Sequence, residues 1–486
     1  MVFASPIFLF LFLPIVLAVY FLLRNEFRNL FLLITSLLFY AWGERQFVVI
    51  MMLSIALNYF LAISIERSKQ SRNIRMAKIM LALAVVLNIG LLVIYKYTNF
   101  IFENIHPLLT MMGFENIKSP NIHLPIGISF FTFHALSYVI DIYRRQASAQ
   151  ENPVTMGLYI SLFPQLMAGP IIRYHDIDKQ LVERRVTLEG FTSGIKRFTI
   201  GLGKKVLIAN TLAFPTDQIF SLPIDKLTVG LSWFAVLCYS MQLYFDFSGY
   251  SDMAIGLARM FGFNFMENFN YPYISQSVKE LWRRWHISLT TWFRDYLYFP
   301  LGGNKINEFR THFNLVVVFV LTGLWHGAAW TYVFWGLFNG VFLVIERHRF
   351  GKLIDSMWAP LRLIYTQLIW FVGLVFFRSL SIGNAFLHLK AMFGFPSGDG
   401  IEYNTGMFVS SEILIALGAG IIASLPLFPF LARRKKRLMA SASARKAGFI
   451  QTGYAMGYTL FLLALFVLSA MSLASGTYNP FIYFRF

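Results

Sequence analysis

Long apolar runs separated by short polar segments dominate the chain. A membrane core about 30 Å thick requires ~20 apolar residues in a helix that rises about 1.5 Å per residue. Runs near that length predict spans at residues 6–23, 29–42, 46–64, 78–98, 206–220, 229–247, 362–378, 413–431 and 453–472. The pattern therefore predicts an all-α polytopic membrane protein, with residues 1–486 forming a single membrane-embedded domain and the first run retained as a span.

Two further apolar segments are less regular. Residues 124–142 carry His134 and Asp141, and residues 155–171 are interrupted by Pro164, Gly169 and Pro170. Lipid cannot satisfy a broken backbone hydrogen bond, so interrupted segments of this kind suit buried or re-entrant helices. With these segments, we expect a bundle of roughly 11 to 14 spanning or re-entrant helices.

Composition and charge support the membrane interpretation. Hydrophobic residues make up 57% of the chain and charged residues 14%, against roughly 25% charged in an average soluble domain. The net charge of +18 is concentrated in loops 24–28, 65–78, 144–145 and 433–446, whereas the alternating loops contain few Lys or Arg. The positive-inside rule then predicts that both termini are extracytoplasmic. No basic, aromatic-interleaved soluble domain stands apart, which argues against nucleic-acid binding.

The most informative stretch is residues 313–346, which is too long for one span and too short for two. A broken helix is therefore expected, with the break near Gly323 and Gly327, two glycines that flank His326. An ionisable residue at membrane depth is a functional candidate by default. The alternative is a structural histidine that hydrogen-bonds to a neighbouring helix.

Residues 265–312 are more polar and predict cytoplasmic-side helices packed on the membrane body. Within it, residues 279–303 interpreted as a helix that ends at Gly302-Gly303 would place Trp282, His286, Leu289 and Phe293 on a single stripe. Three residues at its boundary could contact a phosphate of a donor or lipid, or could simply anchor the interface. These are the arginines Arg283, Arg284 and Arg294.

Several other chemistries lack their signatures. No HExxH motif or close grouping of His, Asp and Glu is evident, and Asp246 and Asp252 have no evident ligand set, so no metal site is expected. The single cysteine, Cys238, excludes an intramolecular disulfide and lies in an apolar run without a basic neighbour. The absence of a Gly-x-Ser-x-Gly elbow and of a P-loop argues against a serine hydrolase and against ATP-driven transport.

Longer motifs carry a family resemblance over nearly the whole chain. They include LPIGISFFTFHALSYVIDIYR at 124–144, YFDFSGYSDMAIGLARMFGF at 244–263, WRRWHISLTTWFRDYLYFPLGGN at 282–304 and TGLWHGAAWTYVFWGLFNG at 322–340. With these motifs the sequence resembles the membrane-bound O-acyltransferases. The resemblance implies a helical bundle around a through-membrane tunnel, with His326 as the catalytic histidine and His286 as the second signature histidine.

The resemblance also implies a function. It predicts an O-acetyltransferase of the bacterial inner membrane that takes an acetyl group from a cytoplasmic thioester, acetyl-CoA, for O-acetylation of an exopolysaccharide such as alginate. An extracytoplasmic partner protein would accept the acetyl group, membrane lipids would surround the chain, and no cofactor would be tightly bound. Substrate contacts are assigned weakly to Arg283, Trp285, Arg294, Asn304 and Trp325.

Besides acylation of a lipid or of a protein, three alternatives stay open at this point. One is D-alanyl transfer from a carrier-protein thioester toward teichoic acid. Another is a polysaccharide or lipid transporter without chemistry that would use His326 as a gate or proton relay. The third is a structural scaffold for a secretion complex. Neither the sequence pattern nor the spacing of the histidines identifies the final acceptor.

Overall fold

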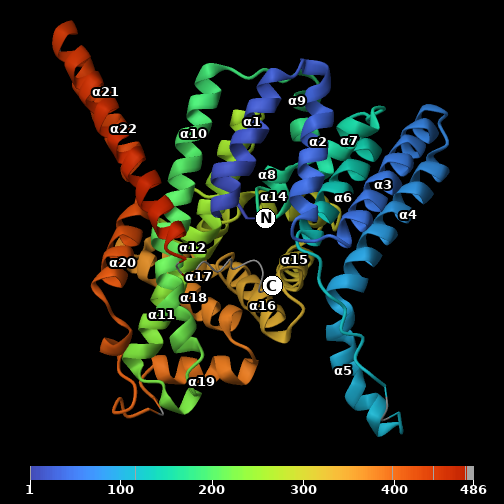
Figure 1. The fold of residues 1–486 in the computed structure, drawn as a ribbon. Helices are drawn as coiled ribbons and strands as arrows, with labels where there is room; N and C mark the ends of the chain where they lie inside the picture. The colour runs from blue at the N-terminus through green and yellow to red at the C-terminus, as the bar shows by residue number, and fades with distance from the viewer. Residues whose placement is uncertain (1, 115–116, 397, 442, 477, 479–486) are drawn as a thin grey trace.

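Helices make up almost all regular structure in the computed structural model of the protein (Figure 1). The structure describes residues 2–114, 117–396, 398–441, 443–476 and 478. Within these ranges there is no β-strand. The all-α fold predicted from the apolar runs is therefore confirmed.

The first group of helices contains the N-terminal spans. Its elements are the π-helix η1 (Phe8–Phe12), α1 (Leu13–Leu22), α2 (Asn25–Ala41), α3 (Phe47–Gln70), α4 (Ile74–Leu92), the π-helix η2 (Val93–Tyr97) and α5 (Thr98–Met111). The chain before η1 is already inside the protein, because the Phe3 side chain is fully buried and stacks on Tyr250 with ring centroids 4.6 Å apart.

The second group contains the most deeply buried helix. Its elements are α6 (Ile128–Arg144), α7 (Pro153–Ser161), α8 (Phe163–Leu166), α9 (Tyr174–Glu183), α10 (Leu188–Gly203), the π-helix η3 (Lys204–Ala209), α11 (Asn210–Phe220), the 3₁₀ turn η4 (Ile224–Lys226) and α12 (Val229–Met260). Helix α12 is central in Figure 1, and nearly all of its residues from Cys238 to Met260 are buried. The predicted interruption of 155–171 corresponds to the short helices α7 and α8.

The third group carries the two signature histidines. Its elements are η5 (Pro272–Ile274), α13 (Val278–Arg284), α14 (Ile287–Phe293), the π-helix η6 (Arg294–Tyr298), α15 (Glu308–His326), α16 (Trp330–Ile345), α17 (Arg349–Ser356), α18 (Ala359–Arg378), α19 (Ile382–Met392), η7 (Thr405–Phe408), α20 (Ser411–Ala423), α21 (Leu427–Ala440) and α22 (Ala444–Ala474).

Four helices among the described residues are long and apolar enough to cross a membrane. They are Phe47–Gln70, Ile74–Met111, Ala359–Arg378 and Arg445–Ala474. The span expected at 413–431 is bent: α20 and α21 meet at an angle of 57° and are long and apolar enough to cross a membrane only when taken together. The bend lies at Pro426, which has no N–H to continue the helix. The remaining helices are shorter or more polar, and among them α10, α11, α19 and α20 pack against α12, as in a polytopic protein with buried and broken helices.

Buried charges in the bundle are paired. Lys205 Nζ lies 2.7 Å from Asp246 Oδ1, and Asp252 accepts from both Lys204 and Arg197. Pairing of this kind offsets the large cost of removing an isolated charge from water. The two aspartates that had no evident partners in the sequence are therefore members of ion pairs between α12 and the α10–η3 segment.

The basic loops collect at one end of the molecule. In Figure 1 the α1–α2 connection, the α3–α4 turn and the α21–α22 connection lie at the upper end, whereas α5 and α19 lie at the lower end. These upper connections include most of the Lys- and Arg-rich loops of the sequence. The C-terminal residues 479–486, for which an extracytoplasmic side was predicted, lie outside the described residues.

Candidate active site

His326 is the last residue of α15, at the tip of a hairpin of two helices. The chain leaves the helix at Gly327, whose φ of −162° is extended, and α16 begins three residues later. The break therefore follows the histidine. Gly323, which was expected to loosen the helix, is a regular residue of α15. A Cβ at this position would collide with the Tyr332 carbonyl oxygen of α16. Gly323 permits close packing of the two helices.

Aromatic rings enclose the His326 side chain, which is only 8% exposed. Its ring centroid lies 5.0 Å from that of Trp325, 5.2 Å from that of Trp335 and 5.2 Å from that of Phe377. These rings come from α15, α16 and α18. They exclude bulk water, and electrostatic interactions with a reacting group are stronger in such an environment than in water.

Two side chains of the first helical group hold the end of α15. The last carbonyl groups of a helix have no partner within the helix. Lys96 Nζ donates to the carbonyl oxygens of Trp325 and, at 3.3 Å, His326, and the Tyr97 hydroxyl donates to the Leu324 carbonyl at 2.7 Å. The buried lysine and the tyrosine thus fix the backbone that carries His326.

His286 occupies a strained turn rather than the middle of a helix. It is the N-cap of α14, with φ 44° and ψ 54°, and only 1% of it is exposed. The continuous stripe of Trp282, His286, Leu289 and Phe293 is therefore a wrong prediction. A non-glycine residue with positive φ ends one helix and redirects the next.

The same turn determines which nitrogen of His286 carries the proton. The Leu289 N–H donates to His286 Nδ1 at 3.3 Å, so Nδ1 acts as an acceptor. A neutral imidazole that accepts at Nδ1 carries its hydrogen at Nε2. Nε2 is buried and has no hydrogen-bond partner among the described residues. His286 is therefore positioned to donate a hydrogen bond to a bound group.

Trp325 lies between the two histidines. Its ring centroid is 6.1 Å from that of His286 and 5.0 Å from that of His326. In the described part of the chain, the buried indole nitrogens of Trp325 and Trp335 also have no hydrogen-bond partner. Buried polar groups in native proteins are almost always paired, so several unpaired donors around one point fit a polar substrate.

The five residues predicted to contact the substrate divide into two sets. Trp285 is buried, with its ring centroid 4.7 Å from Trp370, and Trp325 contacts both histidines. Arg283, Arg294 and Asn304 are exposed, and Arg294 pairs with Asp295. Asn304 comes before the first residue of α15, and His326 is the last residue of that helix. The helix is about 27 Å long, so Asn304 lies near the end of the helix opposite to His326. The structure places Trp325 against both histidines and Trp285 in the buried aromatic cluster with Trp370, but leaves the other three residues at the surface.

A cavity of about 1780 Å³ lies between α10, α12, α20 and α22. Charged side chains of both signs line one part, including Arg197 and Asp252, and apolar side chains of α20 and α22 line the rest. Neither catalytic candidate lines it. Phe269 lines the cavity and packs on Phe247, which in turn contacts His286 with ring centroids 4.5 Å apart. One aromatic layer therefore separates this cavity from the histidines.

Sequence reasoning missed two features. Lys96 lies near the end of the apolar run 78–98 and was not singled out as a candidate. Glu308, His312 and His348 lie together at the other end of the α15–α16 hairpin, so the expectation that no His and Glu residues group closely is wrong. The four-residue spacing of Glu308 and His312 was the available signal.

Comparison with known proteins identifies the family of the chain. Residues 80–377 match the model of the MBOAT, membrane-bound O-acyltransferase family. The chain is 39% identical to a probable alginate O-acetylase AlgI of Azotobacter vinelandii over 503 aligned residues, covering 100% of both chains. It is 34% identical to a peptidoglycan O-acetyltransferase of Helicobacter pylori over 81% of this chain and 80% of that one.

A more distant relative has a different acyl group in its name. A teichoic acid D-alanyltransferase of Bacillus subtilis is 31% identical over 51% of this chain and 67% of its own. The family match covers both His286 and His326 and includes α15 and α16 in full. The chain belongs to the membrane-bound O-acyltransferase family and is an integral membrane acyltransferase.

Proposed function

We propose that the protein transfers an acetyl group from acetyl-CoA on the cytoplasmic side to an acceptor on the opposite side, for O-acetylation of an exopolysaccharide such as alginate. One observation carries this proposal: two buried histidines from separate helices flank Trp325, and one of them presents an unpaired Nε2. A base and a hydrogen-bond donor in one enclosed site are the groups that acyl transfer needs.

In the proposed reaction His326 is the general base. Its imidazole takes the proton of the acceptor hydroxyl as the hydroxyl oxygen attacks the thioester carbonyl carbon. The carbon–sulfur bond then breaks, and the leaving thiolate takes the proton from His326. The products are an acetyl ester and free thiol. General base catalysis of this kind contributes about 10² to 10⁴ in rate.

His286 has the complementary role. Its Nε2–H would donate to the thioester oxygen as negative charge develops there, which is the function of an oxyanion hole. The Leu289 N–H holds the ring in the required tautomer, and the positive φ of His286 directs the ring into the site. Removal of one such donor typically costs about 10² to 10³ in rate.

The names of the relatives support acetyl as the acyl group. The full-length relative is called an alginate O-acetylase and the second an O-acetyltransferase of peptidoglycan, whereas the D-alanyltransferase aligns with only half of this chain. In our proposal an extracytoplasmic partner protein takes the acetyl group and passes it to the polysaccharide. No cofactor is tightly bound.

The proposed location is the bacterial inner membrane. The end of the molecule that gathers the basic connections faces the cytoplasm, since Lys and Arg are retained on that side. Both termini are extracytoplasmic in this arrangement. The donor thioester would reach the histidines from the basic end, and the acceptor from the end that carries α5 and α19.

The proposal is tested by complementation. An alginate-producing host that lacks its own O-acetylase is given the wild-type gene or its His326→Ala variant, and the O-acetyl content of exported alginate is measured by NMR. We expect acetylated alginate only with wild type. A His106→Ala variant, altered on α5, is the matched control.

Either of two results would count against the proposal. Equal acetylation by wild type and by a normally abundant His326→Ala protein would remove His326 from the chemistry. Failure of the wild-type protein to acetylate alginate, together with acetylation of peptidoglycan or D-alanylation of teichoic acid in hosts that make them, would assign a different acceptor.

A further inference from the structure

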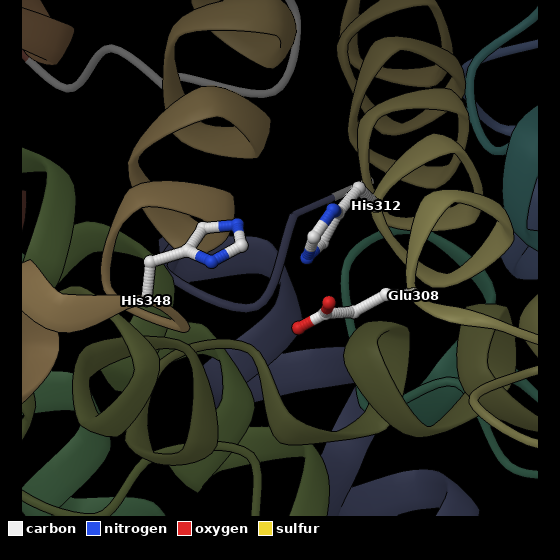
Figure 2. A group of neighbouring side chains, drawn as sticks. All are labelled: Glu308, His312 and His348. Carbon is white, nitrogen blue, oxygen red and sulfur yellow. The ribbon is translucent and has the colours of Figure 1, made fainter.

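Three potential metal ligands converge at the open end of the α15–α16 hairpin. Glu308 and His312 come from the first turns of α15, and His348 lies between α16 and α17. Figure 2 shows the two imidazole rings facing each other across a gap, with the Glu308 carboxylate directed toward the same gap. One ligand atom from each residue lies within 4.8 Å of the other two.

Local structure presents these side chains together. Glu308 and His312 are four residues apart and therefore share one face of α15. The Asn307 side chain accepts from the Arg310 N–H at 2.7 Å and caps the helix at this point. His348 N–H donates to the Ile345 carbonyl at 3.2 Å, and this turn brings its ring to 4.6 Å from that of His312.

A second observation concerns the hydrogen bonding of His312. His312 Nε2 is shielded from solvent and has no hydrogen-bond partner among the described residues. A buried polar atom without a partner costs free energy that native proteins usually avoid. A metal ion in the gap would supply the missing interaction.

We propose that Glu308, His312 and His348 bind a Zn²⁺ ion. Two imidazoles and one carboxylate are the ligands of a borderline divalent transition metal, whereas Mg²⁺ and Ca²⁺ prefer oxygen ligands alone. Zinc binds histidine nitrogen at about 2.0 to 2.1 Å, so two ligands of one ion lie no more than about 4.2 Å apart. Small side-chain rotations close the present gap, and water occupies the fourth position.

The ion would have a structural role. His312 lies 14 residues before His326 in α15, which is about 21 Å along the helix axis, so the ion does not touch the reacting groups. It would join the first turn of α15 to the chain that follows α16. The tip of the same hairpin carries His326, and the zinc would clamp the opposite end. This inference does not depend on the identity of the acyl donor or acceptor.

Zinc binding to the full-length protein is the direct test. The protein is purified in detergent through a tag without histidine, stripped with a chelator, and titrated with Zn²⁺ by calorimetry, with bound zinc measured by mass spectrometry. We expect one equivalent for wild type and for the matched control His106→Ala. The variants His312→Ala, His348→Ala and Glu308→Gln should each bind at least tenfold more weakly.

A second readout guards against variants that do not fold. Zinc should raise the thermal midpoint of stripped wild type and of His106→Ala, but not that of the His312→Ala and His348→Ala variants. Co²⁺ added to stripped wild type should give the visible absorption of a nitrogen-ligated site, and Zn²⁺ should abolish it. The proposal is overturned if wild type binds no zinc, or if all variants bind it equally to wild type.

Discussion

Lys96 Nζ lies 3.3 Å from the carbonyl oxygen of His326, so a buried lysine of η2 holds the backbone of the histidine that we propose as the base. The same ammonium group donates to the Trp325 carbonyl. This contact links helices that are far apart in the sequence. It connects the N-terminal group to the tip of the α15–α16 hairpin, where the reaction is proposed to occur.

Replacement of Lys96 by methionine should slow acetyl transfer at least tenfold. Methionine keeps the apolar length of the side chain but leaves the last carbonyls of α15 without this donor, which costs about 1 to 3 kcal/mol. The transfer rate and the thermal midpoint of purified protein measure the effect. Lys118→Met, at an exposed position, is the control, and equal rates for the two variants would show that Lys96 does not position His326.

The His286→Asn variant separates the two functions of His286. Asparagine tolerates positive φ and is a good N-cap, so its side-chain oxygen can still accept from the Leu289 N–H. It lacks the imidazole Nε2–H. We expect a thermal midpoint close to that of wild type but a kcat about 10² to 10³ lower, as for loss of an oxyanion donor.

The kinetic profile of His286→Asn decides the role of this histidine. An oxyanion donor acts in the transition state, so kcat and kcat/KM should fall together while KM changes little. A rise in KM with unchanged kcat would instead assign His286 to donor binding. Wild-type values of both would exclude it from the reaction.

Close packing of α15 on α16 should make Gly336 intolerant of a side chain. A Cβ at this position would collide with the Phe319 carbonyl oxygen, so Gly336→Ala must move the helices apart. We expect a loss of about 1 to 3 kcal/mol in stability, the usual effect of overpacking. Gly457→Ala on α22 is the control, since nothing lies within 4 Å of its added Cβ. Equal thermal midpoints for the two variants would contradict the packing.

Stability should also depend on the protonation of His175 in α9. Its Nδ1 lies 2.8 Å from Asp141 Oδ2, and this hydrogen bond raises the pKa of His175 although partial burial opposes the rise. A raised pKa means that the folded state favours the protonated form. The resulting stability is full below the ordinary histidine pKa of about 6.5 and is lost as pH rises through the higher folded pKa.

The His175→Gln variant measures this contribution. The difference in thermal midpoint between wild type and variant should be largest in mildly acidic buffer and should shrink as pH rises above the folded pKa. Asp176 and Arg173 also lie near His175 and remain in both proteins. A difference in thermal midpoint that grows with pH would contradict the prediction, because it would mean that the folded state favours the neutral form of His175.

The lengths of the apolar runs predicted the helices well, because a segment in lipid must satisfy its backbone hydrogen bonds internally and therefore forms a helix. The runs at 46–64 and 362–378 correspond to α3 and α18. The assumption that each helical pattern continues without interruption was wrong at two positions. His286 adopts a positive φ that no hydrophobic pattern encodes, and Pro426 bends a run that composition alone would continue.

The site was predictable only in part. The two signature histidines were recognised from motifs, since GLWHG and WRRWH are distinctive local patterns. Lys96 could not be assigned, because its partners are backbone carbonyls in a helix far along the chain. The four-residue spacing of Glu308 and His312 is visible in the sequence, but His348 meets them only after α15 and α16 fold back on each other, so the third member of the cluster could not be predicted.

The most direct measurement is acetyl transfer by purified protein in proteoliposomes. Labelled acetyl-CoA is supplied on the side of the basic loops, and a polysaccharide-acetylating partner protein is enclosed on the other side. Wild-type protein should place label on the enclosed partner, and His326→Ala of equal abundance should place none. Equal labelling with wild type and His326→Ala would contradict the assignment of His326 as the base that drives transfer across the membrane.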